Sequence, residues 1–219
     1  FDGTRRLRAS GGIRLHWIDP PRNTLLSSSW RATIDEALLV VLATEERDIA
    51  VACASAVARQ QGWDEARVGA LFARAAVRAR GWAKLVRATD ESHGETFARL
   101  WLGDAGIRCE PQVRVPRVGR VDFRISPNVY VEIDGGQHDP SWTGSSPSSW
   151  EGDHDRDTAI IADGGQVLRW TYRQLYGAWQ SCLAAAIRAR DRDLELIARR
   201  KSHPRLPRTL APLRKAFAA

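Results

Sequence analysis

The chain has 219 residues, 43% of them hydrophobic, with a formal net charge of +7. This length holds one large domain or two small ones, and no run of about 18 apolar residues is present that would span a membrane. The three cysteines are far apart and form no C-x-x-C pair, which disfavours a zinc knuckle or a disulfide framework and favours a reducing, cytoplasmic setting. The basic excess favours an anionic partner, most often nucleic acid.

The first part of the chain changes character near Trp30. Residues 1–29 are basic and irregular, rich in Gly, Pro and Ser, and we expect no regular domain there. Residues 30–90 contain three Ala-rich amphipathic stretches, which predict a small helical bundle. The stretches are "RATIDEALLVVLATEE", "RDIAVACASAVARQQG" and "DEARVGALFARAAVRARG". Gly62 and Gly81 are predicted to end helices, and Asp64 is predicted to cap the start of one.

A fourth helix is predicted over residues 92–106, "SHGETFARLWLGDAG". Ser92 and Glu95 have the S-x-x-E spacing of a capping box, in which each side chain accepts a hydrogen bond from the other residue's backbone. Gly106 is predicted to close the helix, because glycine readily adopts the left-handed conformation that ends helices.

The hydrophobic period then changes from 3.6 to 2, which indicates strands. From residue 92 onward the predicted order is α-β-β-β-α-β-α, an α/β fold over about residues 92–192 within a domain at 91–195. The predicted strands are "PQVRVP", "GRVDFRI", "NVYVEID" and "QVLRWT", with helices over residues 151–165 and 172–192. Residues 196–219 are predicted to form a basic tail that contains prolines.

Three carboxylates occur on these predicted strands. Asp122 lies on one strand, and Glu132 and Asp134 lie on the next, two residues apart and therefore on one face. If the two strands pair, Asp122 and Glu132 approach each other, and such like charges repel unless a cation joins them. Oxygen ligands favour Mg²⁺ or Mn²⁺. The alternative is that these acids form the solvated face of an antiparallel sheet.

The pattern D-(x₉)-E-x-D resembles the PD-(D/E)xK nuclease motif, although Asp134 stands where that motif has lysine. It is closest to the branch of the very-short-patch-repair (Vsr) mismatch endonucleases and a related bacterial family, in which the last position is not lysine and a nearby histidine contributes. The resemblance runs through "SHGETFARLWLGDAG", "QVRVPRVGRVDFRI", "VYVEIDGGQHD" and "WEGDHDRDTAIIADGGQVLRWTYRQL". It implies a restriction-endonuclease-like core.

The resemblance also implies roles for individual residues. Asp122 would be the central metal ligand, Glu132 would be a second ligand or hold metal-bound water, and Glu95 would support the site from its helix. His138 would act as a general acid or base, with Asp134 and Gln137 beside it. The expected nucleic-acid contacts are Arg120, Gln137, Arg156 and Arg169, and the acidic positions of the later helix are Asp153 and Asp157. Without the resemblance, Glu95 is equally well explained as a capping residue, and His138 as a surface residue.

We therefore expect a metal-dependent endonuclease that hydrolyses DNA. The alternative is an inactive nuclease-fold protein that binds DNA or a protein partner in a defence or toxin–antitoxin system, and the missing lysine supports it. RNA is a further alternative substrate, because composition does not separate it from DNA. The stretch "SSSWRATIDEAL" resembles the segment that follows a winged-helix module in longer antitoxin-type proteins, which implies a DNA-binding module ahead of Phe1.

Overall fold

The computed structural model describes residues 32–116, 118–134, 160–161 and 164–202 of the chain. Contacts divide the chain into two compact units, Phe1–Ala88 and Thr89–Ala219, so that the boundary falls two residues before the predicted one. Among the described helices, none is both long and apolar enough to cross a membrane.

The described part of the first unit is helical, and local capping explains where two of its helices begin. Thr33 and Glu36 form a capping box, and Asp64 accepts a hydrogen bond from the Arg67 backbone as predicted. Gly62 ends a helix with φ +64°. The elements are α1 (Ile34–Thr44), α2 (Arg47–Gln61), α3 (Glu65–Ala73), α4 (Val77–Arg80) and the 3₁₀ helix η1 (Gly81–Leu85).

The third predicted helix of this unit is wrong as a single element. The chain turns after α3 through Ala76, whose ψ of 144° is extended, and Gly81 is both the C-cap of α4 and the first residue of η1. Ala75 and Ala79, on either side of the turn, are both buried. Tertiary packing therefore outweighs the high helix propensity of these alanines.

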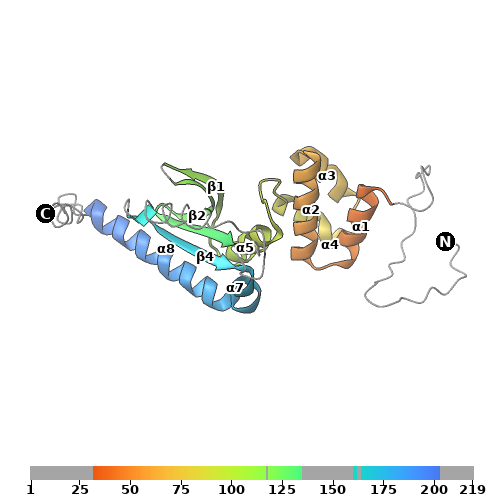
Figure 1. Cartoon of the computed structure of the whole chain (residues 1–219). Coiled ribbons are helices and arrows are strands. Elements are labelled where there is room, and N and C mark those ends of the chain that lie inside the picture. The colour runs from red at the N-terminus through yellow and green to blue at the C-terminus, as the bar shows by residue number, and fades with distance from the viewer. Residues whose placement is uncertain (1–31, 117, 135–159, 162–163, 203–219) are drawn as a thin grey trace, which may run out of the picture. The chain divides into compact units, whose positions relative to one another are not determined.

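The second unit is a mixed α/β domain built on a four-stranded sheet of order β1-β2-β3-β4 (Figure 1). The predicted strands are confirmed to within two residues at each end. Their bounds are β1 (Glu110–Val115), β2 (Gly119–Ser126), β3 (Val129–Asp134) and β4 (Gln166–Thr171). The first three strands are antiparallel, and β4 is parallel to β3.

The helices of this unit are α5 (His93–Asp104), α7 (Tyr172–Gly177) and α8 (Trp179–Ser202). The predicted single helix over 172–192 is wrong, because Ala178 leaves the helical conformation with φ −141°. The predicted tail from residue 196 also begins too early, because α8 continues to Ser202. Of the predicted helix over 151–165, only Ile160 and Ile161 are described as helical, and most of it lies outside the described residues.

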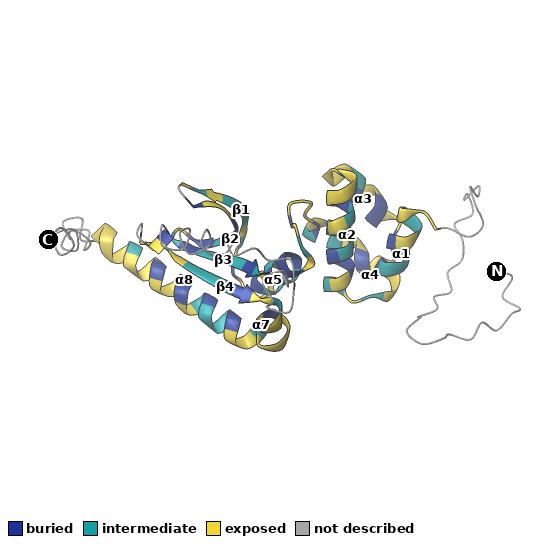
Figure 2. Cartoon of the chain, viewed as in Figure 1, coloured by how far each residue is buried: buried dark blue, intermediate teal, exposed yellow. Residues whose placement is uncertain are grey.

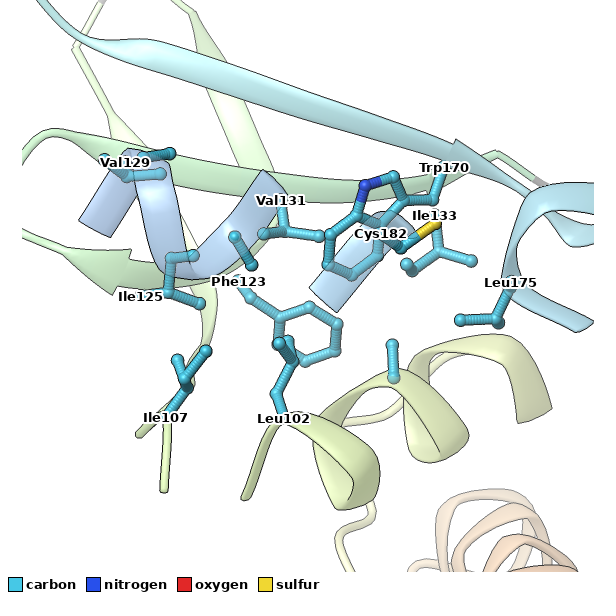
Figure 3. Close-up of a cluster of buried hydrophobic side chains, with 13 residues drawn as sticks. Leu102, Ile107, Phe123, Ile125, Val129, Val131, Ile133, Trp170, Leu175 and Cys182 are labelled. Carbon is cyan, nitrogen blue, oxygen red and sulfur yellow. The ribbon is translucent and has the colours of Figure 1, made fainter. Parts of the chain in front are cut away.

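The main core lies between the sheet and helices α5, α7 and α8, which all pack on one face of it (Figure 3). Val129, Val131 and Ile133 of β3 point into this core, as the alternation of the sequence predicts. Tyr130 points to the opposite face, where it packs against a smaller cluster that includes Ile160. Along α8, buried and exposed residues alternate in bands, as expected for a helix that covers a sheet (Figure 2).

Candidate functional site

Four polar residues occupy one row across the sheet, one from each strand. The ladder sets Glu132 opposite Arg169 directly. The register extended by one residue from the Phe123–Val131 pair places Asp122 opposite Glu132. The pairs on either side of Gln112 place it opposite Asp122. Among the described strands, Asp122 is not itself paired in the ladder with Glu132 or with Gln112. The sheet is therefore irregular at Asp122.

At this irregularity the Asp122 carboxylate contacts the backbone of β3. Val121 and Phe123 belong to the clusters on opposite faces of the sheet, although regular alternation would put them on the same face. Gln112, opposite this point, has a φ of +53°. Asp122 Oδ2 accepts a hydrogen bond from the Ile133 backbone N–H at 2.8 Å. The carboxylate thus replaces a missing ladder contact and lies near both faces.

Glu95 approaches the same region from α5. It is 5% exposed, and its Oε2 accepts hydrogen bonds from the Glu91 backbone N–H at 2.9 Å and from Gln112 Nε2 at 3.0 Å. The predicted capping box is therefore half correct. The Ser92 hydroxyl accepts from the Glu95 N–H at 3.1 Å, but the Glu95 side chain is directed to Glu91 and to the sheet.

A glycine allows α5 to lie this close to the sheet. A Cβ atom built on Gly94 would lie 2.5 Å from Tyr172 Cε1 and 3.0 Å from Ile133 Cγ2. Both distances are shorter than side chains normally tolerate, so any larger residue would displace α5 or its neighbours. Gly94 thereby helps to hold Glu95 beside β3.

Burial shifts the pKa values of two of these acids. The pKa of Glu95 is raised to about 7, mainly by burial and also by the Asp122 carboxylate, against the lowering effect of the hydrogen bond from Glu91. Burial likewise raises the pKa of Asp122, while the hydrogen bond from Ile133 lowers it and the charges of Glu91 and Asp134 raise it. Asp122 is therefore electrostatically coupled to an acid from α5 and to an acid from β3.

Arg169 explains how β3 accommodates two acids. Its guanidinium lies 2.9 Å from Glu132 and 3.6 Å from Asp134, and all three side chains are largely buried. Glu132 and Asp134 alternate along β3 with the residues that point into the main core. Their side chains therefore lie on the other face of the sheet, which carries Tyr130 and is opposite α5. The positive charge predicted to come from a metal is thus supplied in part by a neighbouring strand.

The remaining predicted site residues are only partly described. Arg120 forms an ion pair with Glu91 at 2.6 Å, and its side chain is half exposed. Gln137, His138 and Arg156 lie outside the described residues, as do the predicted helix acids Asp153 and Asp157. The roles assigned to these five residues stay predictions.

Sequence reasoning missed Gln112. Its side chain contacts Glu95, and its Oε1 is buried without a hydrogen-bond partner in the described part of the chain. A signal was present, because Gln112, Asp122 and Glu132 are spaced ten residues apart. Equal spacing through two short antiparallel connections places such residues side by side.

The oxygen donors of the site are chemically suited to a hard divalent cation. Among the described residues, no group of three or more His, Cys, Asp or Glu side chains is arranged to hold a metal ion. Mg²⁺, however, is typically held by one or two carboxylates together with water and substrate phosphates. The carboxylates of Asp122 and Glu95 and the unpartnered oxygen of Gln112 fit that requirement. We refer to Glu95, Gln112, Asp122, Glu132 and Arg169 as the acidic site.

The fold and the acidic site thus define a mixed α/β domain with buried, interacting carboxylates at an irregular point of its sheet. Comparison with known proteins adds no relative: no family model, no curated protein and no solved structure matches the chain.

Proposed function

We propose that the Thr89–Ala219 unit is a metal-dependent endonuclease of the Vsr-like branch of the PD-(D/E)xK superfamily, which hydrolyses phosphodiester bonds in DNA. The observation that carries this proposal is the coupling of Asp122 and Glu95, two buried carboxyl groups from a strand and a preceding helix. Perturbed acids of this kind gather at functional sites. The strand order and the helix before β1 agree with a restriction-endonuclease-like core.

The proposed roles follow the contacts of each side chain. Asp122 would be the central ligand of Mg²⁺ or Mn²⁺, because its carboxylate interacts electrostatically with Glu95 of α5 and with Asp134 of β3. Glu95 supports it, and Glu132 contributes an oxygen while Arg169 holds it in place. When bound, the cation lowers the pKa of its water and stabilises charge on the phosphate. His138, within the predicted loop after β3, exchanges a proton with the attacking water or the leaving oxygen.

Basic residues around the acids bind the DNA backbone in this proposal. Arg120 is half exposed and is held in place by Glu91, so it is available to a phosphate at the rim of the site. The proposal also assigns nucleic-acid contacts to Gln137 and Arg156, as the resemblance implies. Arg169 lies beside Asp134, and it supplies positive charge where related nucleases carry a lysine.

The second candidate is a nuclease-fold protein that binds DNA or a protein partner without cutting. The ion pairs of Arg169 favour it, because they already neutralise part of the charge of Glu132 and Asp134. In that case the acids stabilise the sheet and need no cation.

Cleavage of supercoiled plasmid DNA in Mg²⁺ or Mn²⁺ separates the two candidates. We expect the full chain to nick the plasmid, and Asp122→Asn to reduce the rate at least about a hundredfold, because charge stabilisation by the cation contributes several kcal/mol. Asp191→Asn, at an exposed position of α8, is the matched control and should leave the rate unchanged. Single-stranded RNA, tested in parallel, decides between the nucleic acids.

Two results would count against the enzyme. Equal cleavage by the parent chain and Asp122→Asn would show that this carboxylate is not used. DNA binding by both proteins, without cleavage in either metal, would favour the binding protein instead.

A further inference from the structure

The backbone of Gln112 is in an unusual conformation. With φ +53°, it is the one non-glycine residue with positive φ among the described residues. A side chain in this left-handed region is strained, and the rest of the structure must maintain it. Such strain is found preferentially at ligand-binding and active sites, so the position merits a functional explanation.

The carboxamide of Gln112 is only half satisfied. Its Nε2 donates to Glu95 Oε2 at 3.0 Å, whereas its Oε1 is buried and has no hydrogen-bond partner in the described part of the chain. Leaving a buried acceptor unpaired costs free energy, and most native structures avoid it. A bound group that satisfies Oε1 would remove this cost.

The carboxamide of Gln112 lies beside carboxylates of the acidic site. Gln112 lies opposite Asp122 in the register of β1 and β2, and it contacts Glu95, whose pKa the Asp122 carboxylate raises. A neutral amide oxygen beside two carboxylates completes a set of hard oxygen donors without adding a further negative charge.

We propose that Gln112 Oε1 is an oxygen donor to the divalent cation of the acidic site, directly or through one of its water molecules, while Nε2 holds Glu95 in position. This inference rests on the proposed function, because it assigns a further residue to the same cation. It also gives a reason for the strain at residue 112, since in this conformation the carboxamide reaches Glu95.

The competing explanation is structural. A buried water molecule would satisfy Oε1 without any cation. Replacing Gln112 would then change the stability of the protein equally in the presence and absence of metal. A cation donor instead predicts that the substitution reduces the stabilisation produced by the metal, because a ligand that binds only the native state raises its stability.

Titration calorimetry of Mn²⁺ into the full chain, together with thermal unfolding in EDTA and in Mn²⁺, tests the inference. We expect Gln112→Leu to weaken Mn²⁺ binding at least about tenfold, as loss of a supporting metal-site residue typically does. Gln112→Glu keeps an oxygen at the same reach but loses the Nε2 donor to Glu95, so it should bind Mn²⁺ more tightly than Gln112→Leu. Gln180→Leu, at an exposed position of α8, is the control and should bind as the parent does.

A second variant covers the case in which Gln112→Leu does not fold. Asn tolerates the left-handed region but is one methylene shorter, so Gln112→Asn should fold and still bind Mn²⁺ weakly. If the variant that folds binds as tightly as the parent, the role of Gln112 is overturned and the proposed function stands. If the parent chain itself binds no Mn²⁺, the proposed function and this inference are both overturned.

Discussion

Glu95 shows at the scale of one residue how position changes chemistry. The side chain makes two hydrogen bonds, yet burial raises its pKa from 4.5 to about 7. Because the folded pKa is above the unfolded one, ionisation of Glu95 opposes folding. The native state therefore loses stability as the pH rises from 4.5 to about 7, and the full penalty is present above that range.

This linkage predicts the behaviour of Glu95→Gln. In EDTA, the variant should be more stable than the parent above pH 7, by at most about 3 kcal/mol, and the difference should vanish below pH 4.5. Urea denaturation from pH 4 to pH 8 measures it. Glu195→Gln, at an exposed position of α8, should show no such dependence. A difference that is independent of pH would mean that Glu95 does not titrate in this range.

Short sequence motifs predicted the contacts of a single residue correctly only where its partner lies a few residues away in the chain. Asp64 caps α3, as the spacing predicts. Ser92 caps α5, but Glu95 contacts Gln112, seventeen residues away, instead of completing the box. The choice between these partners depends on the packing of α5 against the sheet, which the four-residue motif does not contain.

At the scale of elements, α8 is joined to the β2–β3 turn by a buried acid. Asp193 accepts hydrogen bonds from the Ser126 hydroxyl at 2.6 Å, from the Asn128 backbone N–H at 3.1 Å and from Asn128 Nδ2 at 2.8 Å. All three donors would lose their partner if the carboxylate were removed. This contact fixes one end of the long helix to the sheet that carries the acidic site.

We expect Asp193→Ala to destabilise the protein by about 2–4 kcal/mol, because buried donors without partners are costly. Chemical denaturation with a fluorescence readout measures the change. Asp191→Ala, two residues earlier, removes an exposed acid that pairs with Arg190 and should change stability by less than about 0.5 kcal/mol. Similar losses in the two variants would show that the hydrogen bonds of Asp193 contribute little.

The sequence predicted the strands more accurately than the helices. The strands were located to within two residues, because alternation and turn residues are local signals. The division of residues 172–202 into α7 and α8 was missed, because "YGAWQ" contains only one glycine and no proline. Packing of Leu175 and Cys182 into the same core accompanies the break at Ala178.

At the scale of the whole molecule, the chain consists of two compact units. Leu42 is fully buried within the first unit, and the acidic site belongs entirely to the second. We expect Leu42→Ala to destabilise the first unit by about 2–5 kcal/mol through the cavity it creates. Hydrogen exchange should show faster exchange in α1 and α2 and unchanged exchange in β2 and β3. Val131→Ala is the converse control, and equal effects on both units in either variant would show that they unfold together.

The sequence by itself determined the kinds of element, their order and the faces of β3, because periodicity, capping residues and turn residues act over a few positions. It also indicated that Asp122 and Glu132 approach each other if their strands pair. The register extended from Phe123 and Val131 sets these two residues opposite each other, although they are not themselves paired in the ladder. Only the tertiary structure decided that Arg169 pairs with Glu132, that Glu95 reaches Gln112, and that Asp122 accepts a hydrogen bond from the Ile133 backbone. These contacts join residues distant in the chain, so they depend on how helix and sheet pack together.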